Sequence, residues 1–576
     1  MLCELWYNLI DGASSKAFSY NYTSKGEIAE VINHLSDRTT VYTYDSGGRL
    51  SYTATYNTSD GDADLKEICS YNDKGELRSV YHDVYYPYRE GFDHHIIEYD
   101  YFYTDDGKLE RIESDGEFLG VTSRYIYDGI NRVIQKQISF TTGYAIVTDI
   151  GYEPGTNRIN SYTRYAHPEL PLTYTYTYDG DGNITKIRYI TGLDTYTVEE
   201  VGYTYDGLGQ LIREDNGLLG ETYVYTYDEA GNITSKSVYP LTAEGVTPTN
   251  PISTKNYGYS DSAWGDLLTS YNGQSITYDE IGNPLTYYNG ASFTWQGRRL
   301  STATLNGNNY SFEYDDNGLR IAKSVGNSRT DYYYSGDKLI AEVCGETVLV
   351  YIYDDAGAPV GYLYRNSAYP DDFWDSYVFD KNLHGDIVGV YAPNSAKLVS
   401  YEYDAWGNCT VIYHGNGAST GAAANPFRYR GYYYDTDLGL YYLGSRYYDA
   451  NTGRFINVDA YVQTPNGDMT SSNMFAYCGN NPVNRKDPTG QFWGELVEIL
   501  KTAALEIGKA MGVVSPAYAA AGGAALADGP LPIGDIIALA AVTFLTAGVI
   551  GQGITKDLLL KQTWVLDCLV VDLFLG

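Results

Sequence analysis

Apolar and polar residues alternate along most of this chain in short runs that stop at a glycine. Residues 176–184, YTYDGDGNI, show the pattern clearly. A period of two predicts a strand in which the tyrosines share one face and the threonine points to the other. The Asp-x-x-Gly step then predicts a turn, because the aspartate adds an Asx-type hydrogen bond and the glycine tolerates positive φ. Each unit therefore predicts a β-hairpin.

This hairpin unit recurs along the chain. Clear copies begin at Tyr42, Tyr176, Tyr203 and Tyr225, and looser copies begin at Ser70, Phe102, Tyr125, Ile276, Phe312, Tyr351 and Tyr401. In the two longest gaps, YEPGTNRI and YSDSAWGDL are candidates for worn-down units. A single hairpin cannot bury its apolar face, so the units must stack side by side. We therefore interpret the recurring aspartate as a turn residue and not as a catalytic one.

Composition supports a β-rich chain and narrows its chemistry. The 576 residues include 64 tyrosines and 61 glycines, which suit strands and tight turns. The net charge of −34 argues against nucleic-acid binding by the repeats, because phosphate contacts need clustered lysine and arginine. The six cysteines are scattered without a CxxC pair, so we expect free thiols, no metal site and no cofactor.

The chain divides by composition into five parts. Residues 1–40 form an N-terminal remnant with a degenerate repeat, 41–414 hold the repeats, and 415–426, GNGASTGAAANP, form a flexible loop. Residues 427–490 are a dense block of aromatic, glycine, arginine and Asx residues, and 491–576 form an apolar tail. The chain begins without a basic leader followed by an apolar stretch, so no signal peptide is predicted. A different export route and a missing N-terminal part would both explain this.

The block at 427–490 carries the most specific motifs in the chain. These are RGYYYD at 430–435, GLYYLGSRYYD at 439–449, TGRF at 452–455 and NPVNRKDPTG at 481–490. In this order they resemble the Rhs-repeat-associated core of Rhs/YD-repeat polymorphic toxins, and the upstream repeats extend the resemblance. It implies a mainly β fold in which the hairpins wind as a spiral sheet into a hollow shell. The family's shells are usually longer, so the sequence does not decide between a closed shell and an incomplete one.

The same resemblance implies that the core is an autoprotease. In the family, two aspartates and an arginine cut the chain just after DPxG, and the matching positions here are Asp459, Asp487 and Arg446. Peptide hydrolysis by carboxylates needs one ionised group to activate water and one protonated group to assist the leaving amine. An arginine would hold the two carboxyl groups and offset their negative charge.

Two features of the sequence speak against cutting. DPTG is also an ordinary turn sequence, and Arg446 could simply pair with Asp449. Family members that are cut have Leu or Trp after DPxG, whereas Gln491 stands here. Whether the chain cuts itself therefore stays open. If the chain is cut, we expect the cut within 490–493, with Gly490, Gln491 and Phe492 as the residues of the cleavage region.

A second candidate lies in LHGDIVGV at 383–390, which resembles a family segment just ahead of the core. Its His384 and Asp386 are residue types that catalysis uses. A strand, a turn and a second strand around a structural histidine explain the same residues, and we favour this interpretation.

The tail at 491–576 differs in kind from the repeats. It begins WGELVEILKTAALEIGKAMGVV after Phe492, with apolar residues at helical spacing, and predicts an amphipathic helix. Beyond GPLP, an apolar run of about 15 residues falls short of the ~20 that span a bilayer. This part resembles the pretoxin region of polymorphic toxins. Three interpretations stay open: a helix inside the shell, membrane contact by 533–553, and a hydrophobic toxin.

The sequence supports two hypotheses about function. In the first, the chain is a toxin shell that encloses and presents its own C-terminal segment, with an immunity protein and a delivery apparatus as partners. In the second, it is a noncatalytic cell-surface or wall-associated YD-repeat protein that binds carbohydrate through its aromatic residues. Both predict a secreted or cell-surface bacterial protein. The core and the pretoxin-like tail favour the first hypothesis, whereas the lack of a recognisable toxin active site favours the second and indicates a truncated effector.

Overall fold

The computed structural model describes residues 4–491 apart from a set of short gaps. These gaps are 9–13, 58–62, 89–90, 117–119, 142, 167–170, 193–196, 355–356, 371–372, 393–395, 420 and 460–472. The chain divides into two compact units, Met1–Ala527 and Asp528–Gly576, and all described residues belong to the first. The predicted helical tail and the membrane contact at 533–553 therefore lie outside the described residues.

Strands make up most of this unit. The first sheet contains β1 (Glu4–Asn8), β2 (Ser14–Tyr22), β3 (Ile28–Asn33), β4 (Arg38–Tyr44), β5 (Leu50–Asn57), β6 (Ala63–Tyr71), β7 (Leu77–Tyr88), β8 (Gly91–Tyr103), β9 (Leu109–Gly116), β10 (Val121–Tyr127), β11 (Val133–Phe140), β12 (Ala145–Tyr152), β13 (Ile159–Ala166), β14 (Leu172–Tyr178), β15 (Ile184–Thr191), β16 (Thr197–Tyr205), β17 (Leu211–Asn216), β18 (Glu221–Tyr227), β19 (Ile233–Pro240), β20 (Ser253–Gly258), β21 (Ser270–Tyr271) and β22 (Gln274–Ser275).

Two further sheets and several 3-10 turns follow. The second sheet contains β23 (Thr277–Tyr278), β24 (Pro284–Thr286), β25 (Ser292–Gln296), β26 (Arg299–Leu305), β27 (Asn308–Tyr314), β28 (Arg320–Val325), β29 (Ser328–Ser335), β30 (Lys338–Cys344), β31 (Thr347–Tyr353), β32 (Pro359–Arg365), β33 (Asp375–Lys381), β34 (Ile387–Tyr391), β35 (Lys397–Tyr403) and β36 (Cys409–Tyr413). The third contains β37 (Tyr433–Asp435), β38 (Leu440–Tyr442), β39 (Tyr447–Asp449) and β40 (Arg454–Phe455). The 3-10 turns are η1 (Gly417–Ser419), η2 (Gly421–Ala424), η3 (Tyr429–Gly431) and η5 (Cys478–Asn480).

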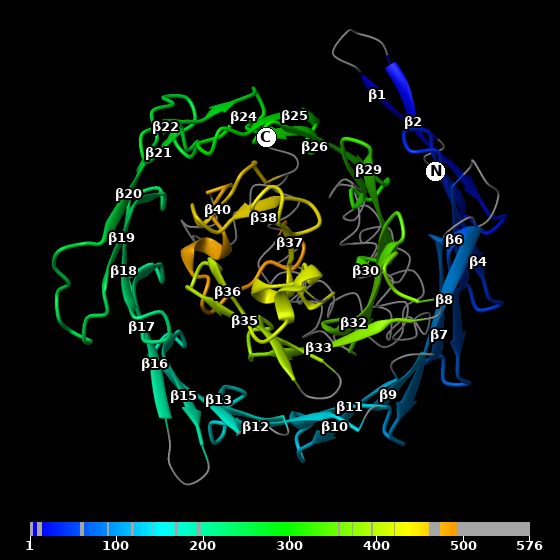
Figure 1. Ribbon diagram of the computed structural model, residues 1–576, viewed down its shortest axis with the longest axis horizontal. Helices are drawn as coiled ribbons and strands as arrows, with labels where there is room; N and C mark the ends of the chain where they lie inside the picture. The colour runs from blue at the N-terminus through cyan, green and yellow to red at the C-terminus, as the bar shows by residue number, and fades with distance from the viewer. Residues whose placement is uncertain are drawn as a thin grey trace, which may run out of the picture. The chain divides into compact units, whose positions relative to one another are not determined.

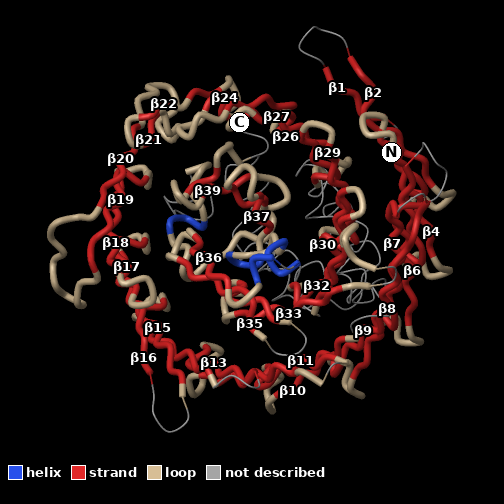
Figure 2. The backbone as a smooth tube through the Cα atoms, viewed as in Figure 1, coloured by secondary structure: helices blue, strands red, loops and turns tan. Residues whose placement is uncertain are grey.

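Within each sheet, each strand pairs antiparallel with the next one along the chain, so every sheet is a meander. Figure 1 shows how the strands of this unit follow one another around a ring and then curl inward as a spiral. We call β1–β27 the wall, β28–β36 the inner turn and residues 427–490 the core segment, which lies inside the ring (Figure 2). The predicted fold, hairpins wound as a shell-like spiral, is confirmed.

The turns have the predicted chemistry. At the turn after β14, the Asp179 Oδ1 atom accepts hydrogen bonds from the N–H groups of Asp181 (3.0 Å) and Asn183 (2.8 Å). Gly182 has a φ of +91°, in the left-handed region that favours glycine. The same pattern recurs at Asp45, Asp128, Asp206, Asp228, Asp279 and Asp404. These repeat aspartates are therefore turn residues.

At most turns of the wall, the tyrosine that precedes the turn joins its hairpin to the one before it. The Tyr227 hydroxyl donates to the main-chain carbonyl of Leu211 (2.6 Å), at the start of the second strand of the preceding hairpin. Equivalent bonds run from Tyr44 to Ile28, from Tyr127 to Leu109, from Tyr205 to Ile184 and from Tyr403 to Ile387, at 2.6–2.9 Å. The worn-down units keep this bond, through Tyr152 to Val133 and Tyr259 to Ile233. The sequence-level assignment of those units is thus confirmed.

A register shift occurs in the hairpins at this same tyrosine. In the pair β18–β19, Thr226 lies opposite Ser235 whereas Tyr227 lies opposite Ile233, so one residue of β19 is skipped. The same shift occurs before Tyr44, Tyr178, Tyr205 and Tyr353. A bulge of this kind bends the strand and increases its twist. Repeating it at the same end of successive hairpins curves the wall.

Ion pairs with at least one buried member join the wall to the inner turn. Arg38 on β4 reaches Asp331 on β29 (2.7 Å), and Lys136 on β11 reaches Asp354 in the turn after β31 (2.5 Å). Arg164 on β13 pairs with Asp380 on β33 in the same way. Because an unpaired buried charge is strongly unfavourable, these contacts favour one winding register over its neighbours.

Two buried carboxyl groups, Glu214 and Asp404, form another contact between the wall and the inner turn. Glu214 on β17 accepts hydrogen bonds from the Ala405 N–H group at both carboxylate oxygens (3.1 and 3.0 Å), in the turn after β35. Lys236 on β19 pairs with Asp404 in the same turn (2.7 Å). Burial, and then the neighbouring Asp404, raise the pKa of Glu214 to about 8. The group is therefore mostly protonated at neutral pH, which limits the repulsion between the two carboxyls.

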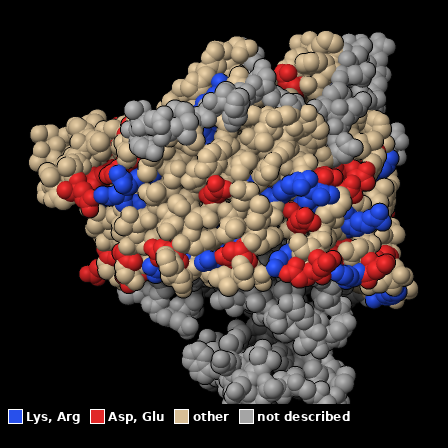
Figure 3. All heavy atoms as spheres, turned by 90° about the horizontal axis from the view of Figure 1, so that it is seen from below, with Lys and Arg blue, Asp and Glu red and all other residues tan. Residues whose placement is uncertain are grey.

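Surface charges are mixed in sign. On the face shown in Figure 3, acidic and basic side chains lie beside one another in bands. Pairs of this kind include Arg49 with Asp45 and Arg132 with Asp128, each within one turn of the wall. No large basic patch is visible on this face.

Two further segments were singled out by the sequence. His384 lies in the turn between β33 and β34, where burial, and then the nearby Arg430, lower its pKa to about 3. Asp386 accepts a hydrogen bond from the Arg430 N–H group (2.7 Å), so the strand–turn–strand interpretation fits both residues. Residues 415–426 contain η1 and η2, and the Tyr362 hydroxyl donates to Gly421 O (2.9 Å). Among the described residues, no helix has the length and apolar character to cross a membrane.

Removing one linking hydroxyl should weaken the wall locally. We expect Tyr227→Phe to reduce local stability by about 1–2 kcal/mol, because the buried Leu211 carbonyl loses its partner. Hydrogen–deuterium exchange in β17–β19 should then speed up about 5–30-fold. Tyr165→Phe is the control, since Tyr165 is 42% exposed. Equal exchange in both variants would contradict the linking role.

The Glu214 cluster predicts a pH dependence. The folded pKa of about 8 lies above the ordinary value of 4.5, so the stabilising effect of the bound proton is present at low pH and declines as pH rises through 8. Glu214→Gln cannot ionise. The urea midpoint of Glu214→Gln minus that of the wild type should therefore increase between pH 5 and 8 and stay constant above pH 8. Exposed Glu199→Gln should follow the wild type; a constant difference for Glu214→Gln across the whole range would disprove the assignment.

Candidate active site

The core segment brings the predicted site residues onto neighbouring loops. Arg446 closes the tight turn between β38 and β39, in which the Leu443 N–H group donates to the Arg446 carbonyl (3.0 Å). Asp459 follows β40, and its N–H group donates to Met474 O (3.1 Å). Asp487 follows η5, and its N–H group donates to the Tyr432 hydroxyl (3.0 Å). Residues far apart in sequence are therefore held by main-chain bonds around one point.

Arg446 contacts both aspartates. Its Nη2 atom lies 2.9 Å from Asp459 Oδ2 and 3.4 Å from Asp487 Oδ2. Its Nε atom donates to the carbonyl oxygen of Gly490, the last residue of DPTG. The guanidinium also stacks on the Phe455 ring, 3.5 Å from the centroid. One arginine thus links both carboxyls to the predicted cleavage region.

The DPTG turn wraps around the second oxygen of Asp487. Asp487 Oδ1 accepts hydrogen bonds from the N–H groups of Thr489 (3.3 Å), Gly490 (2.8 Å) and Gln491 (3.2 Å). Ser445 fixes the far side, where its hydroxyl donates to Thr489 O (2.6 Å). Asp487 is therefore a turn residue as well as a partner of Arg446.

The site is nearly closed to solvent. Asp487 is 1% exposed, Asp459 5% and Arg446 6%. Burial raises the pKa of Asp487 above its ordinary value; Arg446 opposes this rise and Asp459 adds to it. The Asp487 carboxyl thus has a raised affinity for a proton, beside an aspartate that lies closer to the arginine.

The wall fixes the position of the core segment through a row of asparagines. Asn480 donates to Gly231 O (2.6 Å), and Asn481 donates to Asn183 Oδ1 (3.0 Å). Asn484 accepts a hydrogen bond from the Ile184 N–H group (2.7 Å). These bonds reach the turns of successive wall hairpins, so the loop that ends in DPTG is positioned against the wall.

The alternative pairing of Arg446 with Asp449 is not what the structure shows. The Asp449 carboxylate accepts hydrogen bonds from the Tyr287 hydroxyl (2.9 Å) and the Asn451 N–H group (2.9 Å). Of the predicted cleavage region, Gly490 and Gln491 are described and Phe492 lies outside the described residues. In the described part of the chain, no group of His, Cys, Asp and Glu side chains could hold a metal ion.

Sequence reasoning missed one charged residue beside the site. Arg298, in the turn between β25 and β26, donates from Nη1 to Val458 O (3.2 Å), next to Asp459. It belongs to GRRL, which looks like any post-turn segment of a repeat. Nothing local marks it, because its partner lies 160 positions further along the chain.

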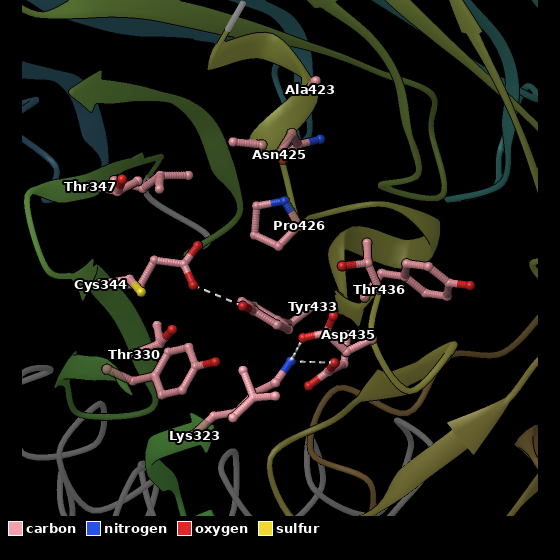
Figure 4. Close-up of a pocket in the computed structure, with 17 residues that line it drawn as sticks. Lys323, Thr330, Cys344, Thr347, Ala423, Asn425, Pro426, Tyr433, Asp435 and Thr436 are labelled. Carbon is pink, nitrogen blue, oxygen red and sulfur yellow. Dashed lines mark hydrogen bonds and ion pairs between the residues drawn. The ribbon is translucent and has the colours of Figure 1, made fainter. Parts of the chain in front are cut away.

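A cavity of about 260 Å³ lies elsewhere, between the inner turn and β37 (Figure 4). Its charged groups bind one another: Lys323 Nζ lies 2.7 Å from Asp435 Oδ1, and the Tyr433 hydroxyl donates to Glu342 Oε2 (2.8 Å). Neither aspartate of the candidate site lines it. The cavity is therefore separate from the candidate active site.

A known family model matches the part of the chain that forms this architecture. The model of the teneurin YD-shell matches residues 152–483, which is more than half of the chain. The chain belongs to the YD-shell family. The match includes the second half of the wall (β13–β27), the whole inner turn and the core segment as far as Val483, so this YD shell is an Rhs/YD-repeat protein, as the motifs predicted.

Relatives and solved structures agree with this placement. The YD shell is 34% identical over 233 residues to the tRNA3(Ser)-specific nuclease WapA of Bacillus spizizenii, covering 39% of this chain and 9% of the relative. It is 28% identical over 335 residues to the double-stranded DNA deaminase toxin A of Burkholderia cenocepacia, covering 50% and 22%. The crystal structure of TcdB2-TccC3-Cdc42 superposes with a TM-score of 0.52 at 18% identity, covering 85% of this chain and 28% of that one, and supports the fold. The chain thus spans less than a quarter of either relative.

The tight packing of Gly490 predicts that its replacement disturbs the site. Gly490 has a φ of +72°, and an added Cβ would lie 2.9 Å from Ser445 Oγ and 3.1 Å from the main-chain nitrogen of Arg446. We expect Gly490→Ala to shift the DPTG turn and to raise the hydrogen-exchange rate of the main-chain amides at residues 485–491 about tenfold or more. Gly129→Ala is the control, because its Cβ would meet open space. Unchanged exchange in Gly490→Ala would contradict this geometry.

Proposed function

We propose that this YD-shell protein is a toxin shell that encloses its own C-terminal segment and cuts it free after DPTG by aspartyl chemistry. The observation that carries the proposal is the position of Arg446, which contacts Asp459, Asp487 and the Gly490 carbonyl together. Enclosure by the wall supports it, because a buried carboxyl pair can divide one proton between its members.

In the proposed reaction, the Asp459 carboxylate takes a proton from water, and the resulting hydroxide adds to the carbonyl carbon of Gly490. Arg446 Nε, which donates to that carbonyl oxygen, stabilises the oxyanion that forms. Asp487 Oδ1 accepts three N–H groups, including that of Gln491 (3.2 Å), so the proton of Asp487 is on Oδ2. Protonated Asp487 gives this proton to the Gln491 nitrogen once that nitrogen has become tetrahedral. The C–N bond then breaks, leaving a carboxyl group on Gly490 and an amine on Gln491.

The geometry favours the bond between Gly490 and Gln491 over the next one. The carbonyl that Arg446 holds belongs to Gly490. In family members with Leu or Trp after DPxG, that residue precedes the cut, which would place the cut here after Gln491 instead. The two sites give fragments that differ by one glutamine residue, so an intact mass distinguishes them.

The wider role follows the names of the relatives. One is a tRNA nuclease and another a DNA deaminase toxin, so we propose that the shell carries a toxic cargo, is secreted or displayed on a bacterial surface, and acts with an immunity protein and a delivery apparatus. Because the chain covers only 9% and 22% of these relatives, the cargo activity is not carried over.

Intact mass of the purified protein tests the cut. Under denaturing conditions, which release an enclosed fragment, the wild type should yield two chains, the smaller of roughly 85 residues. Asp459→Asn and Asp487→Asn should remain as one chain, because each removes a proton donor or acceptor. Asp228→Asn, at a wall turn, is the matched control and should be cut. One uncut mass in all four proteins would refute the proposal and favour a noncatalytic surface role.

A further inference from the structure

The candidate site is not built from the core segment alone. Arg298 lies in the wall, in the turn between β25 and β26, and its Nη1 atom donates to Val458 O (3.2 Å). Val458 is fully buried and packs with Leu267 of the wall and Phe475 of the core segment. Asp459 is the next residue. The backbone that carries the Asp459 carboxyl is therefore held by the wall on one side and by the core on the other.

We infer that Arg298 is a positioning residue for the Asp459 carboxylate, so that the cleavage site is complete only when the wall has wound around the core segment. The inference rests on the proposed self-cleavage and adds a residue and a condition to it. Arg298 contacts neither Gly490 nor Gln491 in any described hydrogen bond, so its effect passes through Asp459.

The charge balance gives Arg298 a second role. In the proposed working state Asp487 is protonated, so Arg446 and Asp459 balance each other and Arg298 adds one positive charge to the group. Burial lowers the pKa of Arg298 and Asp459 opposes this, with Arg446 and Asp279 as its other charged neighbours. An arginine stays charged across the range in which carboxyls titrate. Its field favours the ionised form of Asp459, which is the form that activates water.

The hydrogen bond from Arg298 to Val458 joins parts of the chain that are far apart in sequence. Arg446, Asp459 and Asp487 all belong to the core segment, whereas Arg298 comes from a hairpin that precedes them by more than 140 residues. The asparagine row and the Val458 cluster dock the core on the same wall. A core segment that folds without its wall lacks this support for Asp459. Cutting is then delayed until the cargo is enclosed.

The test compares two neighbouring arginines. Arg298→Gln removes the contact to Val458, whereas Arg299→Gln is the matched control, because Arg299 donates to the carbonyls of Asp315 (3.0 Å) and Asp316 (3.1 Å) within the wall. The full chain is made by cell-free synthesis, and samples at a series of pH values are followed by intact mass. We expect Arg298→Gln to cut roughly 10–100-fold more slowly and Arg299→Gln to match the wild type. Arg298→Lys keeps the charge and should recover part of the rate.

The pH profile separates positioning from simple destabilisation. Loss of the Arg298 charge should raise the pKa of Asp459 and move the acidic limb of the rate–pH profile to higher pH, and Arg298→Lys should move it back. An unchanged rate in Arg298→Gln, or a slower rate with an unchanged profile, would overturn the inference. If Asp459→Asn and Asp487→Asn abolish cutting while Arg298→Gln does not affect it, the proposed function stands and only this inference fails. If the two asparagine variants are cut, both fail.

Discussion

At most turns of the wall, the hydroxyl of the preceding tyrosine donates to a main-chain carbonyl of the hairpin before it, and the wall depends on this bond. At Tyr227 and Tyr205 the acceptors are Leu211 and Ile184, each the first residue of a strand that follows a turn. The register shift at the tyrosine interrupts the regular ladder there. A side-chain donor supplies the hydrogen bond at a place where the sheet must bend. Phenylalanine would fill the same space and leave the carbonyl without that donor.

A sheet that curves by a fixed step at each hairpin eventually meets itself, and buried polar groups control how it does so. Arg38, Arg164 and Lys236 each reach an aspartate on the inner turn. The core then docks through asparagines on the tips of the wall turns. The amide that follows the turn glycine, such as Asn183, bonds its own aspartate and also receives Asn481. The same repeat position thus closes a local turn and seats the core.

The sequence predicted what depends on local chemistry. Asp179 and Gly182 could be assigned to a turn because neighbouring atoms satisfy them, and the tyrosine alternation gave the hairpins. The grouping of Arg446, Asp459 and Asp487 followed from motif order rather than from physical reasoning on the chain. Contacts such as Glu214 with Ala405 and Arg298 with Val458 could not be predicted, because they depend on how far each hairpin rotates the sheet. Small errors in that angle add up over many strands.

Burial of Asp487 has two opposite effects at the candidate site, one on the stability of the fold and one on the proposed chemistry. Removing Asp487 from water raises its pKa and makes an ionised carboxyl unfavourable, which lowers the stability of the fold at neutral pH. The same desolvation lets two similar aspartates take different protonation states, as acid–base hydrolysis requires. Arg446 lies closer to Asp459 (2.9 Å) than to Asp487 (3.4 Å), which adds to the difference. A small core of four short strands could not bury such a group by itself. The surrounding wall supplies the low-dielectric environment, so enclosure of the core segment and the proposed chemistry both depend on one structural feature.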